Sequence, residues 1–171
     1  SFYEFVEQTI AKAEISPSKI ALELTESASI TNNEQAISTI EKLNALGVTI
    51  SIDDFGTGYS SMAYISQLPF QELKVDRQFV ENVSDDIKKK TIAETTVKMG
   101  KGLGLEVVAE GVNSQMDEDA LRAFGCDIGQ GYFYAKPMPL TSYLEWLENE
   151  VNGRVITELE GEFIPRSSKS T

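Results

Sequence analysis

Short apolar runs rich in β-branched residues alternate along the chain with longer stretches whose apolar positions recur at helical spacing. This alternation is typical of βα units on a parallel sheet and predicts an α/β protein. The helical stretches stop at glycines such as Gly47, Gly104 and Gly125, where a left-handed residue would close each helix. Strands are expected at residues 19–25, 48–54, 72–76, 105–111 and 126–131. Helices are expected between and after them at residues 33–46, 87–103, 115–124 and 141–152.

The two ends of the chain differ from this regular middle. Phe2, Phe5, Val6 and Ile10 form an apolar stripe with no expected cap before it, which indicates a chain that opens inside a helix, as an excised segment would. After Gly153 the periodicity is lost, although "RVITELEGEFIP" is compatible with one more strand. Residues 1–152 are therefore predicted to be one partial domain, and residues 153–171 an extension whose polar end is disordered.

Composition and charge narrow the function classes. The chain has 171 residues, of which 41% are hydrophobic, and this is enough for one domain with a real core. It has one cysteine and no histidine, which excludes an internal disulfide, histidine-based zinc sites and Ser-His-Asp catalysis. The formal net charge of -12 argues against a DNA-binding role. No membrane span or signal peptide is visible, so a reducing, cytoplasmic setting is expected, with no membrane contact from this segment. A membrane anchor in a further segment of the parent protein is compatible with this expectation.

Every predicted strand delivers a polar side chain at or near its C-terminal end. Parallel strands are buried on both faces, so such residues are costly unless they are paired or liganded, and in parallel barrels the reacting groups lie at this edge. Single strand ends often carry solvated carboxylates, but five strands doing so together indicate a site. The residues are Glu23, Asp53, Asp54, Lys74, Glu110 and Gln130.

The residue types in this set indicate the chemistry. Carboxylate oxygens favour Mg²⁺ or Mn²⁺, and clustered carboxylates repel one another unless cations lie between them. Two such ions can activate water and stabilise the leaving oxygen of a phosphodiester, while Lys74 orients the water or neutralises phosphate charge. A divalent-metal site would also explain how an acidic protein accepts an anionic substrate.

At these residues the chain resembles the EAL domain, the bacterial phosphodiesterase domain that hydrolyses cyclic di-GMP to linear pGpG. The motifs that carry the resemblance are "LELTES", "DDFGTGYSS", "LPFQELKVDRQFV", "VVAEGV" and "GCDIGQGYFYAKPMP". They lie in the family's order and spacing across residues 2–152. The resemblance implies a (β/α)₈ TIM-barrel-like fold, of which this chain would contain about five βα units.

The resemblance also implies a role for each site residue. Glu23, Asp53, Asp54 and Glu110 match metal ligands for two Mg²⁺ or Mn²⁺ ions, and Glu110 also matches a residue for base catalysis. Lys74 matches the lysine at the catalytic water. Gln130 matches a polar residue of the active centre, and Glu26 matches the glutamate that steadies the loop after the aspartate pair. That loop, which in the family links the metal site to dimerisation, comprises Phe55, Gly56, Thr57, Gly58, Tyr59, Ser60 and Ser61. Consecutive strand residues point to opposite faces, so both aspartates can face one site only where the strand ends, and Gly56 and Gly58 are expected to supply the turn there.

Two departures from the family qualify this interpretation. A barrel of this type needs about 250 residues, and the Glu-Ala-Leu motif and the strand with a metal-binding asparagine are missing. The segment alone is therefore expected to be inactive and to associate, through exposed barrel edges, with another copy or with the absent half. Many active members also have a glutamate where this chain has Asn113. The alternative is a degenerate EAL domain that binds cyclic di-GMP or a protein partner without cleavage. Upstream GGDEF or sensory domains are common in the family.

Overall fold

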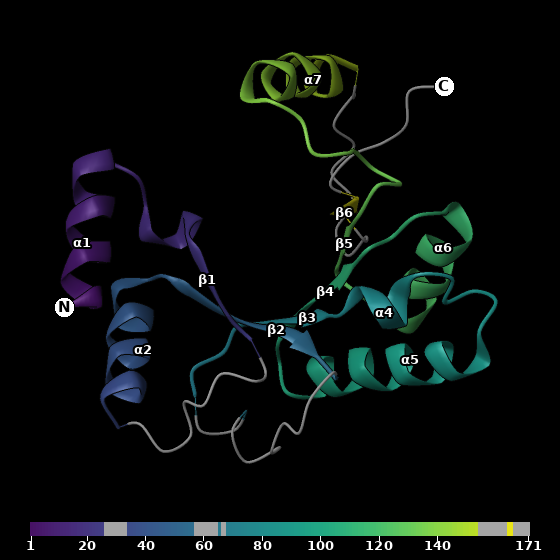
Figure 1. The fold of residues 1–171 in the computed structure, drawn as a ribbon, viewed down its shortest axis with the longest axis horizontal. Helices are drawn as coiled ribbons and strands as arrows, with labels where there is room; N and C mark the ends of the chain where they lie inside the picture. Colours follow the sequence, from purple (N-terminus) through teal and green to yellow (C-terminus); the bar gives the residue numbers. More distant parts are fainter. Residues whose placement is uncertain (26–33, 57–64, 66–67, 154–163, 166–171) are drawn as a thin grey trace. The chain divides into compact units, whose positions relative to one another are not determined.

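The structure is a computed structural model that describes residues 1–25, 34–56, 65, 68–153 and 164–165 (Figure 1). The chain forms two compact units. The first unit comprises residues 1–76 and 99–107, and the second comprises residues 77–98 and 108–171. Each unit has its own parallel strands and its own buried apolar side chains.

The first unit is built on parallel strands in chain order. Its complete strands are β1 (Ala21–Thr25), β2 (Thr49–Phe55) and β3 (Glu72–Val75). The pairing of β1 with β2 runs from Ala21 opposite Thr49 to Thr25 opposite Asp53. The amide of Glu106 donates to the carbonyl of Gln71 at 2.9 Å, which brings the start of the next strand beside β3.

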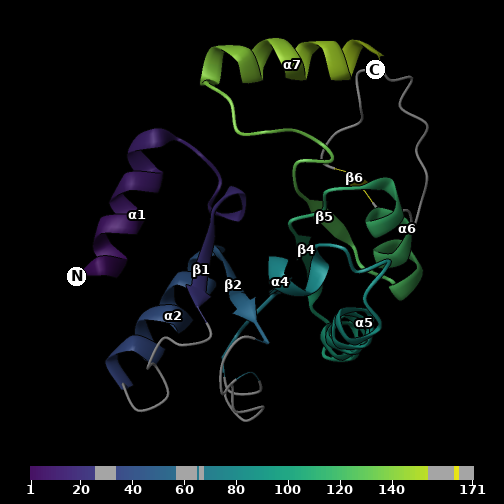
Figure 2. The same cartoon turned by 45° about the vertical axis from the view of Figure 1, so that its right-hand side comes forward.

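Helices flank these strands and complete the core of the first unit. They are α1 (Phe2–Ala13), the short 3₁₀ helix η1 (Pro17–Lys19) and α2 (Glu34–Leu46). Figure 2 shows α1 and α2 beside β1. Ile40 and Leu43 of α2 are buried together with Ile50 and Ile52 of β2. Gly47, with a φ of 101°, ends α2 in the left-handed conformation that the sequence predicted there.

The start of the chain corrects one prediction. Helix α1 does have an N-terminal cap, because the Ser1 side chain accepts a hydrogen bond from the amide of Glu4 and the Glu4 carboxylate accepts from the terminal amine at 2.8 Å. This is a capping box, which satisfies amides that the first helical turn leaves free. The expectation of an uncapped helix overlooked the serine at the first position.

The second unit repeats the strand and helix alternation. Its elements are α4 (Arg77–Val80), most of α5 (Ile87–Gly102), the end of β4 (Glu106–Glu110), α6 (Gln115–Phe124), β5 (Ile128–Gln130), α7 (Leu140–Gly153) and β6 (Ile164–Pro165). Parallel pairing joins β4 to β5, with Glu110 opposite Gln130, and β5 to β6. The N-cap of α6 is Ser114, and Gly125 with a φ of 88° ends the helix.

The predicted elements are largely confirmed. All five expected strands are present, each shorter at one or both ends except β2, which begins and ends one residue later than predicted. The expected helix at 115–124 matches α6 residue for residue, and the short helices η1 and α4 were not predicted. The additional strand expected within residues 154–165 is represented by the two residues of β6. Among the described residues, none of the helices combines the length and apolar content that crossing a membrane requires.

Candidate functional site

Asp53 and Asp54 lie at a distortion near the end of β2. The register between β2 and β3 shifts between Ile52 and Phe55, and Asp54 has a left-handed backbone with a φ of 55°. A regular strand would direct two consecutive side chains to opposite faces. The irregularity changes this alternation, and the two aspartates offer carboxylate oxygens within 4.8 Å of each other.

The position of this turn differs from the prediction. The sequence indicated a strand that ends at Asp54 and a turn supplied by Gly56 and Gly58, whereas β2 continues through the buried Phe55. The change of direction therefore begins at Asp54 itself, and aspartate is among the few residues other than glycine that adopt this conformation readily. Gly56 contributes as expected, with a φ of 97°.

Lys74 is the buried cation of a polar cluster in the first unit. Its side chain is only 7% exposed, and Nζ lies 2.7 Å from Oε1 of Glu23 and 3.4 Å from Oδ1 of Asp53. A buried ammonium is costly unless carboxylates compensate its charge. Strands β1, β2 and β3 thus each contribute one charged residue to the same cluster, as the pattern of polar strand ends predicted.

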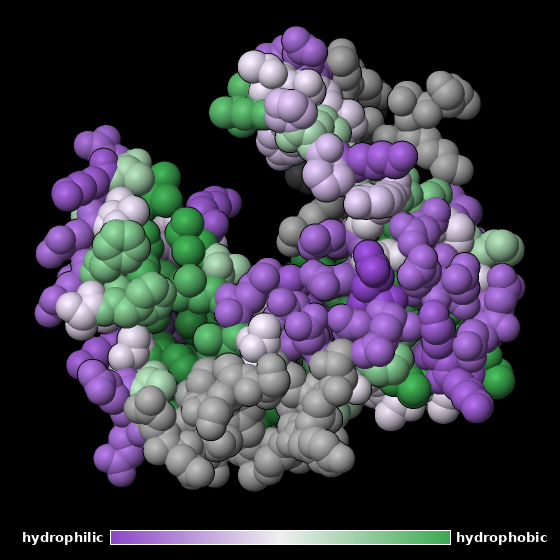
Figure 3. Space-filling view, viewed as in Figure 1, coloured by the Kyte–Doolittle hydropathy of each residue, from purple (hydrophilic) through white to green (hydrophobic). Residues whose placement is uncertain are grey.

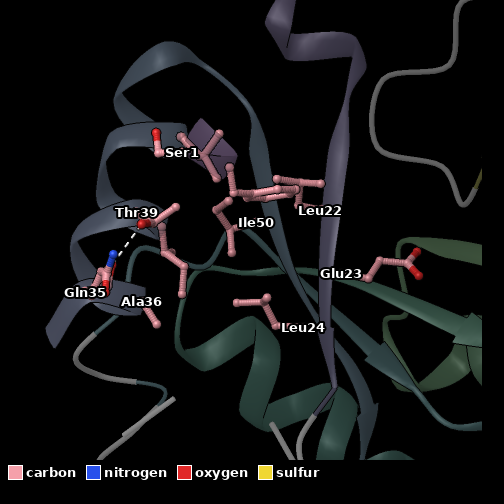
Figure 4. Close-up of a pocket in the computed structure, with 11 residues that line it drawn as sticks. Ser1, Leu22, Glu23, Leu24, Gln35, Ala36, Thr39 and Ile50 are labelled. Atoms are coloured by element: carbon pink, nitrogen blue, oxygen red, sulfur yellow. Dashed lines mark hydrogen bonds between the residues drawn. The ribbon is translucent and has the colours of Figure 1, made fainter. Parts of the chain in front are cut away.

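Alternation along β1 separates this polar cluster from an apolar cavity. Leu22 and Leu24 line a cavity of about 450 Å³ with residues of α1 and α2. Figure 4 shows both leucines on the side of α2, and the carboxylate of Glu23 on the opposite side of β1. The two leucines of β1 therefore pack towards the helices, whereas the carboxylate of Glu23 lies on the other side of the strand and pairs with Lys74.

Glu110 and Gln130 meet at the ends of β4 and β5 in the second unit. The two residues are register partners in the parallel pairing. Both line a cavity of about 440 Å³, together with Asn113, Arg77 and Tyr132. This cavity brings together the two site residues that the sequence placed in the later strands, and it adds Arg77 as a residue that the strand-end pattern did not select.

The loops after β4 and β5 approach each other closely at Gly131. A Cβ atom at this position would lie 2.1 Å from the carbonyl oxygen and 2.4 Å from the amide nitrogen of Val112. The amide of Val112 donates to the carbonyl of Gln130 at 3.0 Å, which joins the two loops. The absence of a side chain at Gly131 therefore permits the close approach of the two loops, and this approach positions the segment that contains Gln130.

We expect Gly131→Ala to lower the free energy of unfolding by about 1 to 3 kcal/mol, the usual cost of overpacking, because backbone atoms of Val112 must move to admit the methyl group. Urea denaturation followed by circular dichroism measures this change. Gly102→Ala is the matched control, since a Cβ there meets nothing within 4 Å. Equal midpoints for the two variants would contradict the close approach.

Several predicted site residues lie outside the described part of the chain. These are Glu26 and the loop residues Thr57, Gly58, Tyr59, Ser60 and Ser61. Most of the predicted extension, residues 154–163 and 166–171, also lies outside it.

The donor atoms of the first unit fit a hard divalent cation. Oδ1 of Asp53 is buried and accepts no hydrogen bond from the described residues, because Lys74 at 3.4 Å is not aligned to donate one. A buried carboxylate oxygen without a donor is unfavourable in a protein interior but suits a metal ligand. Carboxylates are the ligands that Mg²⁺ and Mn²⁺ prefer. Asp53, Asp54 and Glu23 are thus chemically suited to hold such an ion.

Parallel strands with carboxylates, a lysine and an amide at their C-terminal ends define an α/β domain whose side chains suit a divalent-metal site. The EAL domain family model matches residues 1–137, and the chain belongs to this family. The family assignment confirms the resemblance that the five motifs indicated.

Two of the relatives that the chain resembles are named as cyclic di-GMP phosphodiesterases. Cyclic di-GMP phosphodiesterase NbdA of Pseudomonas aeruginosa is 40% identical over 147 residues, which are 86% of this chain and 19% of NbdA. Bifunctional diguanylate cyclase/cyclic di-GMP phosphodiesterase MucR of the same organism is 39% identical over 139 residues, which are 81% of this chain and 20% of MucR. The chain therefore spans about a fifth of the length of these relatives.

Solved structures of relatives contain the dinucleotide. The fold is similar to that of the PaMucR phosphodiesterase in complex with cyclic di-GMP, with a TM-score of 0.75 and 38% identity over 81% of this chain and 56% of that one. It is also similar to Klebsiella pneumoniae BlrP1 in complex with manganese and cyclic di-GMP, with a TM-score of 0.72 and 28% identity over 78% of this chain and 34% of that one. A calcium complex of BlrP1 with the dinucleotide is similar to the same degree. The TIM-barrel-like EAL fold is thus the fold of this chain.

Proposed function

We propose that this chain is the part of an EAL phosphodiesterase domain that supplies catalytic and metal-binding residues for hydrolysis of cyclic di-GMP to pGpG. The observation that carries the proposal is the cluster of Glu23, Asp53 and Lys74 at 2.7 and 3.4 Å, with Asp54 beside it on a distorted strand. A buried lysine among carboxylates at strand ends is the residue set that phosphodiester hydrolysis needs. The names of NbdA and MucR support the substrate class.

The proposed roles follow the chemistry of each side chain. Glu23, Asp53, Asp54 and Glu110 are the proposed ligands of two divalent cations, Mg²⁺ or Mn²⁺. When bound, these cations would supply Lewis-acid stabilisation of phosphate charge and activation of the attacking water. The metal in the BlrP1 complexes supports a divalent-metal requirement.

The chain's own residues would orient the reaction. Lys74 holds the attacking water or a phosphate oxygen through its ammonium, and Glu110 accepts the proton that the water loses. The water oxygen forms a bond to phosphorus while the bond from phosphorus to the 3′ oxygen breaks. The leaving 3′ oxygen takes up a proton from solvent, so the products are a 5′-phosphate and a 3′-hydroxyl, as in pGpG. Gln130 would position the substrate as an uncharged donor and acceptor.

A receptor without catalysis is the second candidate function. Asn113 lines the cavity that also contains Glu110 and Gln130, so a neutral amide occupies a position where many active members have a carboxylate. Binding of cyclic di-GMP without product in the presence of either metal would favour this candidate.

We also propose association through the free edge of β1. Among the described residues β1 pairs with β2 alone, and its alternate residues are exposed. Figure 3 shows apolar side chains gathered at the surface of the first unit beside α1. Phe2 and Phe5 of this helix are 56% and 65% exposed. A second copy or a further segment of the same domain would cover this edge. The proposed setting is the cytoplasm, in a protein that carries further signalling domains.

The direct test is incubation of the full-length protein with cyclic di-GMP and Mg²⁺ or Mn²⁺, followed by chromatography of the nucleotides. We expect pGpG to accumulate, and removal of the metal with EDTA to stop its formation because the carboxylates then lack the cations that activate water. Readdition of metal should restore turnover. Intact cyclic di-GMP after incubation of folded protein with each metal would refute the enzyme.

A further inference from the structure

Arg77 places a guanidinium without a partner at the cavity of the second unit. The residue begins α4, is exposed, and makes no side-chain hydrogen bond or ion pair within the part of the chain that the structure describes. It is the one cation among the described residues that line the cavity of about 440 Å³. Two carboxylates, those of Glu81 and Glu110, line the same cavity without pairing with it.

The stem of Arg77 is held by a contact that only glycine permits. A Cβ atom on Gly111 would lie 2.1 Å from Cγ of Arg77 and 2.9 Å from its Cβ and Cδ. Gly111 also has a φ of 75°, which side-chain-bearing residues rarely adopt. The methylene groups of Arg77 therefore lie against the backbone directly after Glu110, and this packing keeps the guanidinium beside the cavity.

We propose that Arg77 is a substrate-binding residue that holds a phosphate oxygen of the dinucleotide in this cavity. The proposal rests on the proposed function for its substrate class. A guanidinium offers a planar fork of donors that matches the oxygens of a phosphate, and it stays charged at every physiological pH. The amides of Asn113 and Gln130 line the same cavity and add neutral donors, whereas Glu81 and Glu110 repel an anion. Arg77 is thus the group that makes this cavity able to accept a phosphate.

The test compares two replacements of Arg77 in the full-length protein. Arg77→Met keeps an apolar side chain that can pack against Gly111 and removes the charge. Arg77→Lys keeps the charge and removes the planar pair of donors that a guanidinium offers. Lys90→Met is the matched control, because Lys90 is an exposed cation of α5 that is not among the residues lining the cavity. The Kd for cyclic di-GMP is measured by titration calorimetry with Ca²⁺, and chromatography checks that the ligand stays intact.

We expect Arg77→Met to raise the Kd about 10- to 100-fold, the range for loss of a charge-assisted hydrogen bond, and Lys90→Met to leave it unchanged. The Kd should rise with salt less steeply in Arg77→Met than in the wild type, and as steeply as in the wild type in Arg77→Lys, because added salt screens the ion pair that only a cation makes. A role limited to packing on Gly111 would not change this slope. If Arg77→Met does not fold, the same two measurements on Arg77→Gln replace it.

Formation of pGpG with Mn²⁺ is measured separately from binding. A protein that binds the dinucleotide without cleaving it would refute the proposed hydrolysis and would still allow the role of Arg77 to be tested. Weakened binding by Arg77→Met supports the inference whether or not the wild-type protein forms product. Wild-type affinity and salt slope in Arg77→Met overturn it even where product forms. Absence of any binding by the wild type overturns it together with the substrate class.

Discussion

Replacing Asp53 by asparagine is expected to abolish hydrolysis of cyclic di-GMP while leaving the protein folded. The carboxylate is a proposed metal ligand, and an amide oxygen binds Mg²⁺ or Mn²⁺ far less strongly. Loss of residues that only orient a metal ligand already costs 10- to 100-fold, so loss of a ligand should cost about 1,000-fold or more in kcat/KM. The free energy of unfolding should change by less than about 1 kcal/mol, because asparagine has the same shape, Oδ1 of Asp53 accepts no hydrogen bond from the described residues, and Lys74 keeps its shorter ion pair with Glu23 at 2.7 Å.

Two measurements separate loss of the metal from loss of the fold. Thermal denaturation with and without Mn²⁺ should show a large stabilisation by the metal in the wild type and a much smaller one in Asp53→Asn. Asp85→Asn, which removes the same charge at an exposed position, should keep both the activity and the response to metal. Wild-type turnover by Asp53→Asn would refute Asp53 as a ligand.

The strands and most helices were predictable because their signals are local. Helix α6 begins at Ser114, whose side chain accepts from the amide of Asp117, and ends at Gly125. Both signals are visible in the sequence as a capping residue and a glycine at helical distance. The polar residues at strand ends were equally predictable, since parallel strands are buried on both faces and leave few places for a charge.

The distortion at Asp54 was not predictable from the same signals. Aspartate occurs in many turns and strand ends, so the residue type does not reveal that this one has a φ of 55° within β2. The register shift that accompanies it depends on pairing with β3, a strand some twenty residues later. Local pattern therefore located the aspartate pair correctly and misplaced the turn.

Arg77 was missed for a related reason. It lies two residues after the end of β3 in the sequence "KVDRQF", where an exposed arginine needs no explanation. Its significance comes from Gly111, which is 34 positions later and leaves room for the arginine stem. A contact between residues this distant in sequence has no periodic signature. The structure therefore adds Arg77, through its contact with Gly111, to the residues that the sequence already indicated.

Replacing Lys74 by methionine is expected to impair both stability and activity. Lys74 and Lys98 make ion pairs of the same length, since each Nζ lies 2.7 Å from a glutamate oxygen, but the Lys74 side chain is 7% exposed and that of Lys98 is 67% exposed. Removal of one partner of a buried pair costs about 3 to 5 kcal/mol. Because Glu23 is half exposed, solvent screens part of the loss, and we expect about 1 to 3 kcal/mol for Lys74→Met. The matched variant Lys98→Met should cost at most about 0.5 kcal/mol.

The response to metal distinguishes the role of Lys74 from that of its carboxylate partners. Without the ammonium, Glu23 and Asp53 repel each other and lack a counter charge. Binding of a divalent cation therefore stabilises the folded state of this variant by more than that of the wild type. Mn²⁺ should therefore raise the melting temperature of Lys74→Met by more than that of the wild type, the opposite of its effect on Asp53→Asn. Turnover should nevertheless fall by about 100- to 10,000-fold, the range for a group that acts directly on the reacting water. A Lys74→Met protein that is as stable as the wild type and responds equally to Mn²⁺ would show that Lys74 does not neutralise this cluster.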